Sequence, residues 1–213
     1  GILPAYETVK KGTNLALANK ESVVAAGRLI LDTAKKTGSQ VIPVDSEHSA
    51  IYQCLMGQRK EFLSRIILTA SGGAFRKTPC DALAFMGVEE ALKHPNWSMG
   101  SKITVDSATM MNKGLELIEA RFLFDVSPDM LDVVIHPQSI VHSAVSFKDG
   151  SMLAQMGCPD MRTPISFALG LPDRINSGVK QLDLTDISRL EFSKPDPEKY
   201  RCLQIALEVL KKD

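Results

Sequence analysis

The fold class is decided by residues 14–48, which read NLALANKESVVAAGRLILDTAKKTGSQVIPVDSEH. The apolar runs at 14–18 and 40–44 predict two short strands. The segment between them predicts a helix, with Ser22 as its expected N-cap. A strand, a helix and a second strand in this order predict a right-handed parallel crossover. The polar residues 19–21 would then lie at the carboxyl end of a strand, where open α/β sheets bind ligands.

The rest of the chain predicts a mixed sheet with several helices. Strands are expected at 65–70, 132–145 and 152–155, and helices at 49–63, 107–124 and 198–211. Asp149-Gly150 is a turn signal between the last two strands. The segment 71–100 holds the one Trp and is punctuated by Gly and Pro, so it is expected to be a mobile loop. We therefore expect an α/β protein.

The composition excludes several classes of protein. The chain has 213 residues, 44% of them hydrophobic, which is enough for one substantial core. Lys plus Arg and Asp plus Glu number 25 each, so net charge favours neither a nucleic-acid partner nor an acidic membrane surface. No apolar stretch approaches the ~20 residues that span a bilayer. The four cysteines form no C-x-x-C pair, which favours reduced thiols.

Carboxylates near position 45 suggest a site for a hard metal ion. If the strand continues through Glu47, the side chains of Asp45 and Glu47 point the same way, because residues two apart share a face of an extended chain. Glu116, in the expected 107–124 helix, is a third carboxylate. Oxygen ligands favour Mg²⁺ or Mn²⁺ over zinc, and the histidines lack zinc spacing. The alternative is a solvated loop edge, where charged residues usually lie.

The 107–124 helix also suggests a site for a phosphate. Ser107 and Asn112 are expected in its first turns, where the helix dipole favours anions. Gly114 inside the helix would permit close approach of either a ligand or another helix. One face carries an apolar stripe, and another face carries Asn112, Glu116 and Glu119, with Lys113 one turn from Glu116. An ordinary solvated face with an ion pair is the alternative.

Two loop features fit the same kind of ligand. Ser71-Gly72-Gly73 follows a strand and could present backbone N–H groups to a phosphate. Trp97 and Met99 could close over a ligand and exclude water, or could form a small hydrophobic cluster under the loop. Neither G-x-G-x-x-G nor a Walker motif occurs, so the chain carries no dinucleotide fingerprint of its own.

Together these motifs closely resemble the 1-deoxy-D-xylulose 5-phosphate reductoisomerase family. The matching runs span most of the chain in the family's order: ALANKES (16–22), PVDSEH (43–48), SGGAFR (71–76), HPNWSMG (94–100), VDSATMMNKGLE (105–116), HPQSIVHS (136–143) and GCPDMRTPI (157–165). The resemblance implies a metal-dependent enzyme that isomerises its phosphosugar and reduces it with NADPH to 2-C-methyl-D-erythritol 4-phosphate. The metal would bind a hydroxy-ketone through two oxygens as a Lewis acid.

The same resemblance implies a role for individual residues. Mg²⁺ or Mn²⁺ would be held by Asp45, Glu47 and Glu116. Catalytic roles would fall to Lys20, Glu47, His94 and Glu116. NADPH would contact Asn19, Glu21, Gly100 and Met161. The phosphosugar would be bound by Lys20, Ser46, Glu47, Ser71, His94, Trp97, Ser107, Asn112, Lys113 and Glu116.

The resemblance also implies a division into domains. The parts would be the end of a Rossmann-like dinucleotide-binding domain (1–44), an α+β catalytic domain with a mixed sheet (45–170) that includes a lid loop (71–100), a linker (171–197) and the start of a C-terminal helical domain (198–213). The family's glycine-rich phosphate-binding turn would precede residue 1. We therefore expect no NADPH-dependent turnover from this chain alone.

Two other readings of the sequence remain open. The chain could be a non-catalytic phosphosugar-binding module that forms a homodimer, with strands around 132–155 pairing across a two-fold axis. It could also be a metal-dependent phosphosugar lyase or isomerase that uses no nicotinamide. A bacterial cytoplasm or a plastid would suit the implied enzyme.

Overall fold

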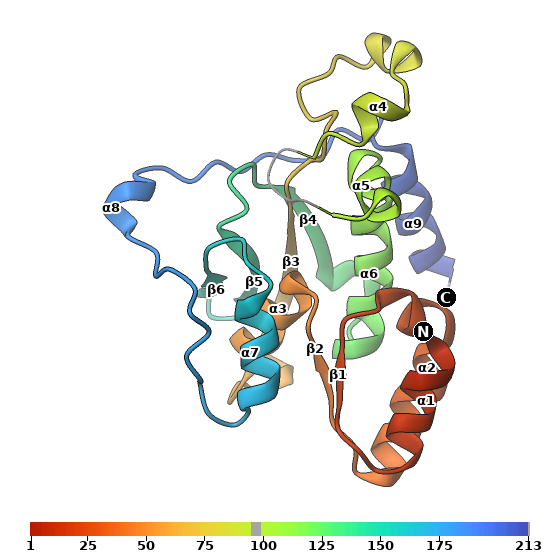
Figure 1. The fold of residues 1–213 in the computed structure, drawn as a ribbon, viewed down its shortest axis with the longest axis vertical. Coiled ribbons are helices and arrows are strands. Elements are labelled where there is room, and N and C mark those ends of the chain that lie inside the picture. Colours follow the sequence, from red (N-terminus) through yellow and green to blue (C-terminus); the bar gives the residue numbers. More distant parts are fainter. Residues whose placement is uncertain (95–98, 213) are drawn as a thin grey trace.

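The computed structural model describes residues 1–94 and 99–212. Trp97, an expected substrate contact, lies outside the described residues. The N-terminal part consists of α1 (Ile2–Lys10), β1 (Leu15–Leu17), α2 (Lys20–Thr37) and β2 (Val41–Pro43). Strands β1 and β2 pair in parallel, which confirms the arrangement expected from the sequence (Figure 1). The sequence patterns described above do not predict α1.

Helix α2 begins earlier than the sequence suggested. Its N-cap is Asn19, so Ser22 lies inside the first turn and donates a hydrogen bond from Oγ to Oδ1 of Asn19. At the other end, Gly38 adopts a left-handed conformation (φ 77°), which terminates the helix. The earlier start places Lys20 in the first turn of α2, directly after β1, with its side chain buried.

A second, four-stranded sheet forms the centre of the molecule, in the order β4-β3-β5-β6. Its strands are β3 (Leu63–Ala70), β4 (Leu131–Ile135), β5 (Val141–Phe147) and β6 (Met152–Met156). Strand β3 runs parallel to β4 and antiparallel to β5, which in turn pairs antiparallel with β6, so the expected mixed sheet is confirmed. The single strand expected at 132–145 is wrong, because the chain turns at 136–140 and forms two strands.

The single helix expected at 107–124 is also wrong, because this part of the chain forms two helices. Helix α5 (Ser101–Ala108) ends before Met110, whose φ of 60° breaks the helical path, and α6 (Met111–Phe124) follows. Ser107 therefore lies at the carboxyl end of α5 and not in a first turn. The helix expected at 49–63 is α3 (Ser46–Leu55), followed by a 3₁₀ turn at Lys60–Phe62.

The remaining elements surround these sheets. The segment 71–91 contains a 3₁₀ turn (Asp81–Phe85) and α4 (Val88–Ala91), and it projects from the top of the molecule in Figure 1. After β6 come α7 (Arg162–Gly170), which the sequence patterns do not predict, and the short α8 (Leu184–Ile187). A further 3₁₀ turn (Pro128–Met130) precedes β4, and α9 (Arg201–Lys212) confirms the last expected helix. Among the described residues, no helix is long and apolar enough to cross a membrane.

Helix α6 lies between two hydrophobic cores. Leu117 of α6 is fully buried in the main core, which also contains Ile66 and Leu68 of β3 and Leu203 of α9. Phe122, near the other end of α6, packs against the smaller core formed by α1, α2 and β1. Lys113, Glu116 and Glu119 of α6 are buried as well, so this helix does not present them on a solvated face. Charged side chains of α6 therefore lie in the interior of the protein.

Candidate active site

A cavity of about 310 Å³ lies where the carboxyl ends of β1, β2 and β3 approach α5 and α6. Most of the site residues expected from the sequence line it. They are Lys20, Asp45, Ser46, Glu47, Ser71, His94, Ser107, Asn112, Lys113, Glu116 and Met161. Three of the residues expected to contact NADPH are not among its lining residues, namely Asn19, Glu21 and Gly100. Asn19 and Gly100 instead cap α2 and α5.

Asp45 and Glu47 converge for a different reason from the one expected. The strand ends at Pro43, and Asp45 is the N-cap of α3, where its side chain accepts a hydrogen bond from the backbone N–H of Glu47 over 3.4 Å. The prediction of an extended chain through Glu47 is therefore wrong. The carboxylates nevertheless approach Glu116, and one oxygen from each of the three lies within 4.8 Å of the others.

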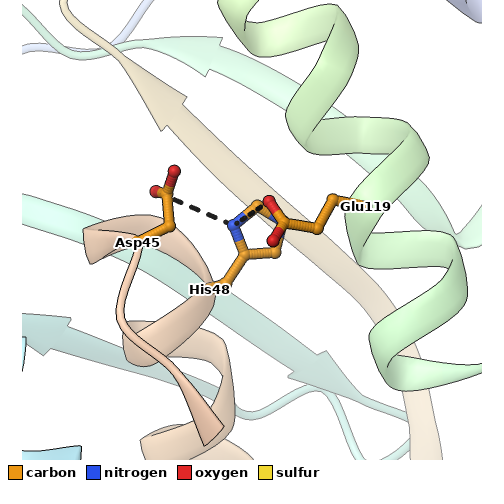
Figure 2. Close-up of side chains that lie close together, drawn as sticks. All are labelled: Asp45, His48 and Glu119. Atoms are coloured by element: carbon orange, nitrogen blue, oxygen red, sulfur yellow. Dashed lines mark ion pairs between the residues drawn. The ribbon is translucent and has the colours of Figure 1, made fainter. Parts of the chain in front are cut away.

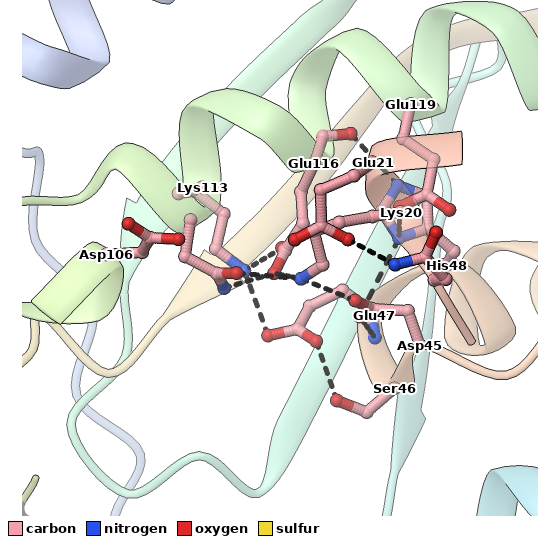
Figure 3. Close-up of polar contacts among 12 residues, drawn as sticks. Lys20, Glu21, Asp45, Ser46, Glu47, His48, Asp106, Lys113, Glu116 and Glu119 are labelled. Atoms are coloured by element: carbon pink, nitrogen blue, oxygen red, sulfur yellow. Dashed lines mark hydrogen bonds and ion pairs between the residues drawn. The ribbon is translucent and has the colours of Figure 1, made fainter. Parts of the chain in front are cut away.

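Two buried lysines bridge these carboxylates (Figure 3). Lys20 Nζ lies 2.6 Å from Oδ2 of Asp45 and 2.9 Å from Oε1 of Glu116. Lys113 Nζ lies 2.9 Å from Oε1 of Glu47 and also pairs with Glu116. Lys20, Lys113 and Glu116 are each at most 5% exposed, and charged side chains become so buried only when they are paired.

The local charges shift the pKa of each group. Burial and the neighbouring Glu116 raise the pKa of Glu47 to about 7. Burial would also raise the pKa of Asp45, but Lys20, His48 and the hydrogen bond from Glu47 together outweigh it and hold this pKa well below 3.8. Burial would lower the pKa of Lys20 and of Lys113, yet the carboxylates beside each lysine raise it. The three carboxylates therefore outnumber the two lysines that pair with them, and Glu47 is the carboxyl whose pKa is raised.

His48 and Glu119 extend the cluster behind Asp45 (Figure 2). His48 Nε2 lies 2.9 Å from the carbonyl oxygen of Glu116, and Nδ1 lies 3.3 Å from Oε2 of Glu119 and 3.7 Å from Oδ1 of Asp45. Burial opposes protonation of His48, but Glu119 and Asp45 raise its pKa to about 9. Burial raises the pKa of Glu119 to about 7. Neither residue is among the site residues that the resemblance implies.

Another part of the cavity wall is built from the turn after β3. Ser71 Oγ hydrogen-bonds with His94 Nε2 over 3.1 Å and accepts from the backbone N–H of Gly73 over 3.1 Å. Gly73 adopts φ 66°, and a Cβ atom there would lie 2.3 Å from the carbonyl oxygen of Ser107. Burial and, to a smaller extent, Arg76 lower the pKa of His94. A neutral His94 is thus favoured.

Asn112 and Ser107 also line the cavity, from different helices. Asn112 is the second residue of α6, where the helix dipole favours an anion. Its Nδ2 donates to Oε1 of Glu116 over 2.5 Å, and its Oδ1 accepts from Lys20 Nζ over 2.8 Å. The dipole argument made for Ser107 is wrong, because the carboxyl end of α5 does not favour an anion. Ser107 still lines the cavity.

Ser139 and His142 are polar residues that also line the cavity, although the sequence motifs predict no role for them. Ser139 has φ 53°, an uncommon conformation for a residue other than Gly, and His142 follows at the start of β5. Burial lowers the pKa of His142. Both belong to the run HPQSIVHS, so the signal was present in the resemblance, although no chemistry in the sequence alone set these two residues apart.

Glu21 makes contacts outside the cavity. It accepts a hydrogen bond from Nδ2 of Asn19 over 2.7 Å and pairs with Lys102 of α5 over 2.6 Å. Lys102 also pairs with Asp106 over 2.9 Å. These contacts join the first turn of α2 to α5 beside the cavity, so the expected NADPH contacts Asn19, Glu21 and Gly100 lie at its margin.

Comparison with protein families gives matches along most of the chain. The model described as the 1-deoxy-D-xylulose 5-phosphate reductoisomerase C-terminal domain matches residues 41–124. The model described as the DXP reductoisomerase C-terminal domain matches residues 156–213. A third, described as 1-deoxy-D-xylulose 5-phosphate reductoisomerase, matches residues 1–27.

Curated proteins and solved structures give similar matches. The 1-deoxy-D-xylulose 5-phosphate reductoisomerase of Chlorobium phaeovibrioides is 55% identical over 211 residues, which are 99% of this chain and 55% of that protein. The enzyme of Trichlorobacter lovleyi is 53% identical, over 99% of this chain and 54% of its own length. This chain therefore spans about half the length of the curated relatives it matches.

Among solved structures, a DOX-P reductoisomerase in complex with NADPH, fosmidomycin and magnesium superimposes with a TM-score of 0.94. It is 47% identical, over 100% of this chain and 54% of that one. The Zymomonas mobilis enzyme in complex with NADPH gives a TM-score of 0.91 at 45% identity, over 98% of this chain and 54% of that one.

Proposed function

Because the chain belongs to the 1-deoxy-D-xylulose 5-phosphate reductoisomerase family, we propose that it forms the metal- and substrate-binding part of such an enzyme. The complete reaction would convert 1-deoxy-D-xylulose 5-phosphate to 2-C-methyl-D-erythritol 4-phosphate with NADPH. The observation that carries the proposal is the convergence of Asp45, Glu47 and Glu116 on one side of a cavity that also holds Ser71 and Asn112.

The carboxylate cluster fits a divalent cation. It offers only oxygen ligands, which suit Mg²⁺ or Mn²⁺, and the raised pKa of Glu47 indicates that positive charge is lacking there. Asp45, Glu47 and Glu116 would hold the ion. When bound, the cation would polarise the carbonyl and hydroxyl oxygens of the substrate as a Lewis acid. A cation would also replace the lysines as the partner of these buried carboxylates.

The chain's own side chains would bind and orient the substrate. Lys113, the amide of Asn112 and the hydroxyls of Ser71 and Ser107 would bind the phosphate, with His94 beside Ser71. Lys20 and Ser46 would contact oxygens nearer the metal ligands, and Trp97 is proposed as a further substrate contact. Lys20, Glu47, His94 and Glu116 are the proposed catalytic residues.

NADPH would approach at the margin of this cavity. We propose contacts from Asn19, Glu21 and Gly100, which lie at the first turns of α2 and α5, and from Met161, which lines the cavity. Hydride transfer is the chemistry of the cofactor, and the protein aligns it. Because this chain spans about half the length of its relatives, NADPH-dependent turnover is proposed for the whole protein.

We also propose that the protein forms a homodimer through β6. This strand is at the edge of the sheet, and its Met152 and Leu153 are 56% and 42% exposed. An exposed apolar edge strand can pair with a second copy. Light scattering during gel filtration would measure the mass. A bacterial cytoplasm or a plastid is the compartment that we propose, in line with the bacterial relatives.

The proposed function is tested by calorimetric titration of Mn²⁺ into the chain, with and without the substrate analogue fosmidomycin. We expect one Mn²⁺ per chain, bound more tightly in the presence of fosmidomycin and lost in Glu116→Gln. Glu208→Gln, at an exposed position of α9, is the matched control and should bind like the wild type. Absence of Mn²⁺ binding by a folded wild-type chain, with melting monitored by circular dichroism, would contradict the proposal.

A further inference from the structure

His136 is a fully buried histidine outside the carboxylate cluster, and both of its ring nitrogens have partners. Nε2 lies 3.2 Å from the backbone nitrogen of Ile140 and 3.2 Å from that of Val141. Backbone N–H groups only donate, so Nε2 carries no proton and accepts both bonds. The proton is therefore on Nδ1, which donates to the carbonyl oxygen of Glu191 over 2.9 Å. The ring is a neutral tautomer fixed by three backbone groups.

The three bonds join two parts of the chain that are far apart in sequence. On one side is the turn 136–140 between β4 and β5, whose Ser139 lines the cavity. The backbone N–H of His136 also donates to the carbonyl oxygen of Ala70, which lines the cavity at the end of β3. On the other side is the segment 189–193, within the stretch that the sequence suggested was a linker. His136 thus ties the cavity wall to a segment that does not itself line the cavity.

The segment 189–193 is held against β4 by several further contacts. Ser193 and Ile135 form an antiparallel bridge, with N···O distances of 2.8 and 3.0 Å. The ring of Phe192 stacks on His136 at a centroid distance of 4.6 Å. Gln138 donates to the carbonyl oxygen of Arg189 over 3.2 Å. The segment therefore covers the edge of β4 as a fixed strap rather than a free connection.

The conformation of the turn explains why it needs such support. Ser139 adopts φ 53°, and a non-Gly residue in the left-handed region stores strain that the surroundings must offset. The backbone N–H of Ser139 donates to the carbonyl oxygen of His136 over 3.1 Å, and the ring of His136 then holds the next two N–H groups. Without an acceptor at Nε2, two N–H groups beside the turn would lose their partner, and the turn could relax away from the cavity.

We propose that His136 is a positioning residue: it fixes the turn that carries Ser139 against the substrate cavity and couples that turn to the strap 189–193. This inference rests on the proposed function, because it assigns the strap a part in shaping the substrate site. His136 is not among the residues that line the cavity. The strap would transmit any displacement of the 189–193 segment to one wall of the cavity, while the metal ligands on α3 and α6 would keep their places.

Two substitutions separate the bonds made by the ring. Gln can place an amide oxygen where Nε2 stood and accept the two N–H bonds of the turn. Asn places its amide where Nδ1 stood and can replace only the bond to Glu191. We expect His136→Asn to weaken fosmidomycin binding by about tenfold or more, since misplacement of a positioning group by about 1 Å is costly. His136→Gln should retain most of the affinity, and both variants should bind Mn²⁺ like the wild type.

Val133→Ala is the matched control, because Val133 is a buried residue of β4 whose apolar side chain can make none of the hydrogen bonds described. It should lower the melting temperature without changing fosmidomycin affinity. Amide hydrogen exchange of Ile140 and Val141 gives a second measurement, which should accelerate in His136→Asn and not in Val133→Ala. Equal fosmidomycin affinity and equal exchange in His136→Asn and wild type would overturn the proposal. A wild-type chain that binds no fosmidomycin would instead contradict the proposed function.

Discussion

Lys20 of α2 and Glu116 of α6 form an ion pair of 2.9 Å although 96 residues separate them in the chain. Lys20 is 5% exposed and Glu116 is 1% exposed, so the pair is shielded from water. Removing one partner of a buried pair leaves the other charge without compensation, which is strongly destabilising. Lys20 also neutralises Asp45, and the same lysine therefore stabilises two of the three proposed metal ligands.

Lys20→Met should destabilise the metal-free chain and strengthen its response to Mn²⁺. We expect the free energy of unfolding in EDTA to fall by about 3 kcal/mol, because Asp45 and Glu116 lose their cation. Saturating Mn²⁺ should restore more stability to the variant than it adds to the wild type, since Nζ no longer competes for the same oxygens. Urea unfolding with EDTA and with Mn²⁺ measures both effects.

The control for this prediction is Lys102→Met. Lys102 also pairs with two carboxylates, Glu21 and Asp106, but its side chain is 62% exposed. Exposed pairs contribute ~1 kcal/mol or less, so this variant should change little and should respond to Mn²⁺ like the wild type. An equal Mn²⁺ response in Lys20→Met and wild type would show that Lys20 does not compete with the cation.

The stability of the metal-free chain should fall as the pH rises from about 6.5 to 9, above the range in which the lowered pKa values of His94 and His142 act in the opposite direction. Glu47 and Glu119 have pKa values raised from 4.5 to about 7, and His48 has one raised from 6.5 to about 9. In each case the folded chain keeps a proton that the unfolded chain releases, so the stabilisation is complete at low pH and is lost through the folded pKa. Each such proton contributes ~1.4 kcal/mol per pH unit.

Urea midpoints in EDTA at several pH values between about 6.5 and 9 measure this dependence. Mn²⁺ should reverse its sign, because the ligand carboxylates must release their protons to bind a metal. Midpoints with saturating Mn²⁺ should therefore rise with pH. A flat or rising profile in EDTA would mean that the carboxylates are ionised in the folded chain, and that Lys20 and Lys113 compensate them fully.

The sequence predicted which side chains come together better than it predicted the backbone that brings them together. It identified Asp45, Glu47 and Glu116 as a set, but it placed Asp45 and Glu47 on an extended strand, whereas Asp45 caps α3. A strand end and a helix cap differ by a few backbone angles, and Asp is common at both helix caps and loop edges. Pro137 was a usable signal that the strand expected at 132–145 is broken.

Other features depend on contacts that no local pattern contains. The break at Met110 requires a left-handed conformation at a residue that rarely adopts one, so tertiary packing must impose it. The burial of Glu116 and Glu119 on α6 is decided by partners from α2 and α3. Periodicity within α6 alone favours a solvated face for such residues. The hydrogen bond between His136 and Glu191 likewise joins residues that are 55 positions apart in the chain.

Gly73→Ala should weaken binding of the substrate analogue without affecting the metal. A Cβ atom at Gly73 would lie 2.3 Å from the carbonyl oxygen of Ser107, so the turn that carries Ser71 must move away from α5. We expect fosmidomycin affinity to fall about tenfold or more, and Mn²⁺ affinity in its absence to stay unchanged. Gly150→Ala is the matched control: it has φ 88° but no atom within 4 Å of its Cβ. Equal fosmidomycin affinities in the two variants would contradict this role of Gly73.

Gly114 permits close packing of α6 against α9, which decides between the two explanations that its sequence position left open. A Cβ atom there would lie 2.6 Å from Cβ of Ala206. Gly114→Ala should therefore lower the free energy of unfolding by about 1–3 kcal/mol, although Ala favours a helix by ~1 kcal/mol. Adding Ala206→Gly removes the facing methyl group, so the double variant should be more stable than the sum of the single changes predicts. Urea unfolding of the four proteins measures this coupling, and additive changes would mean that the two helices can separate to accept the methyl group.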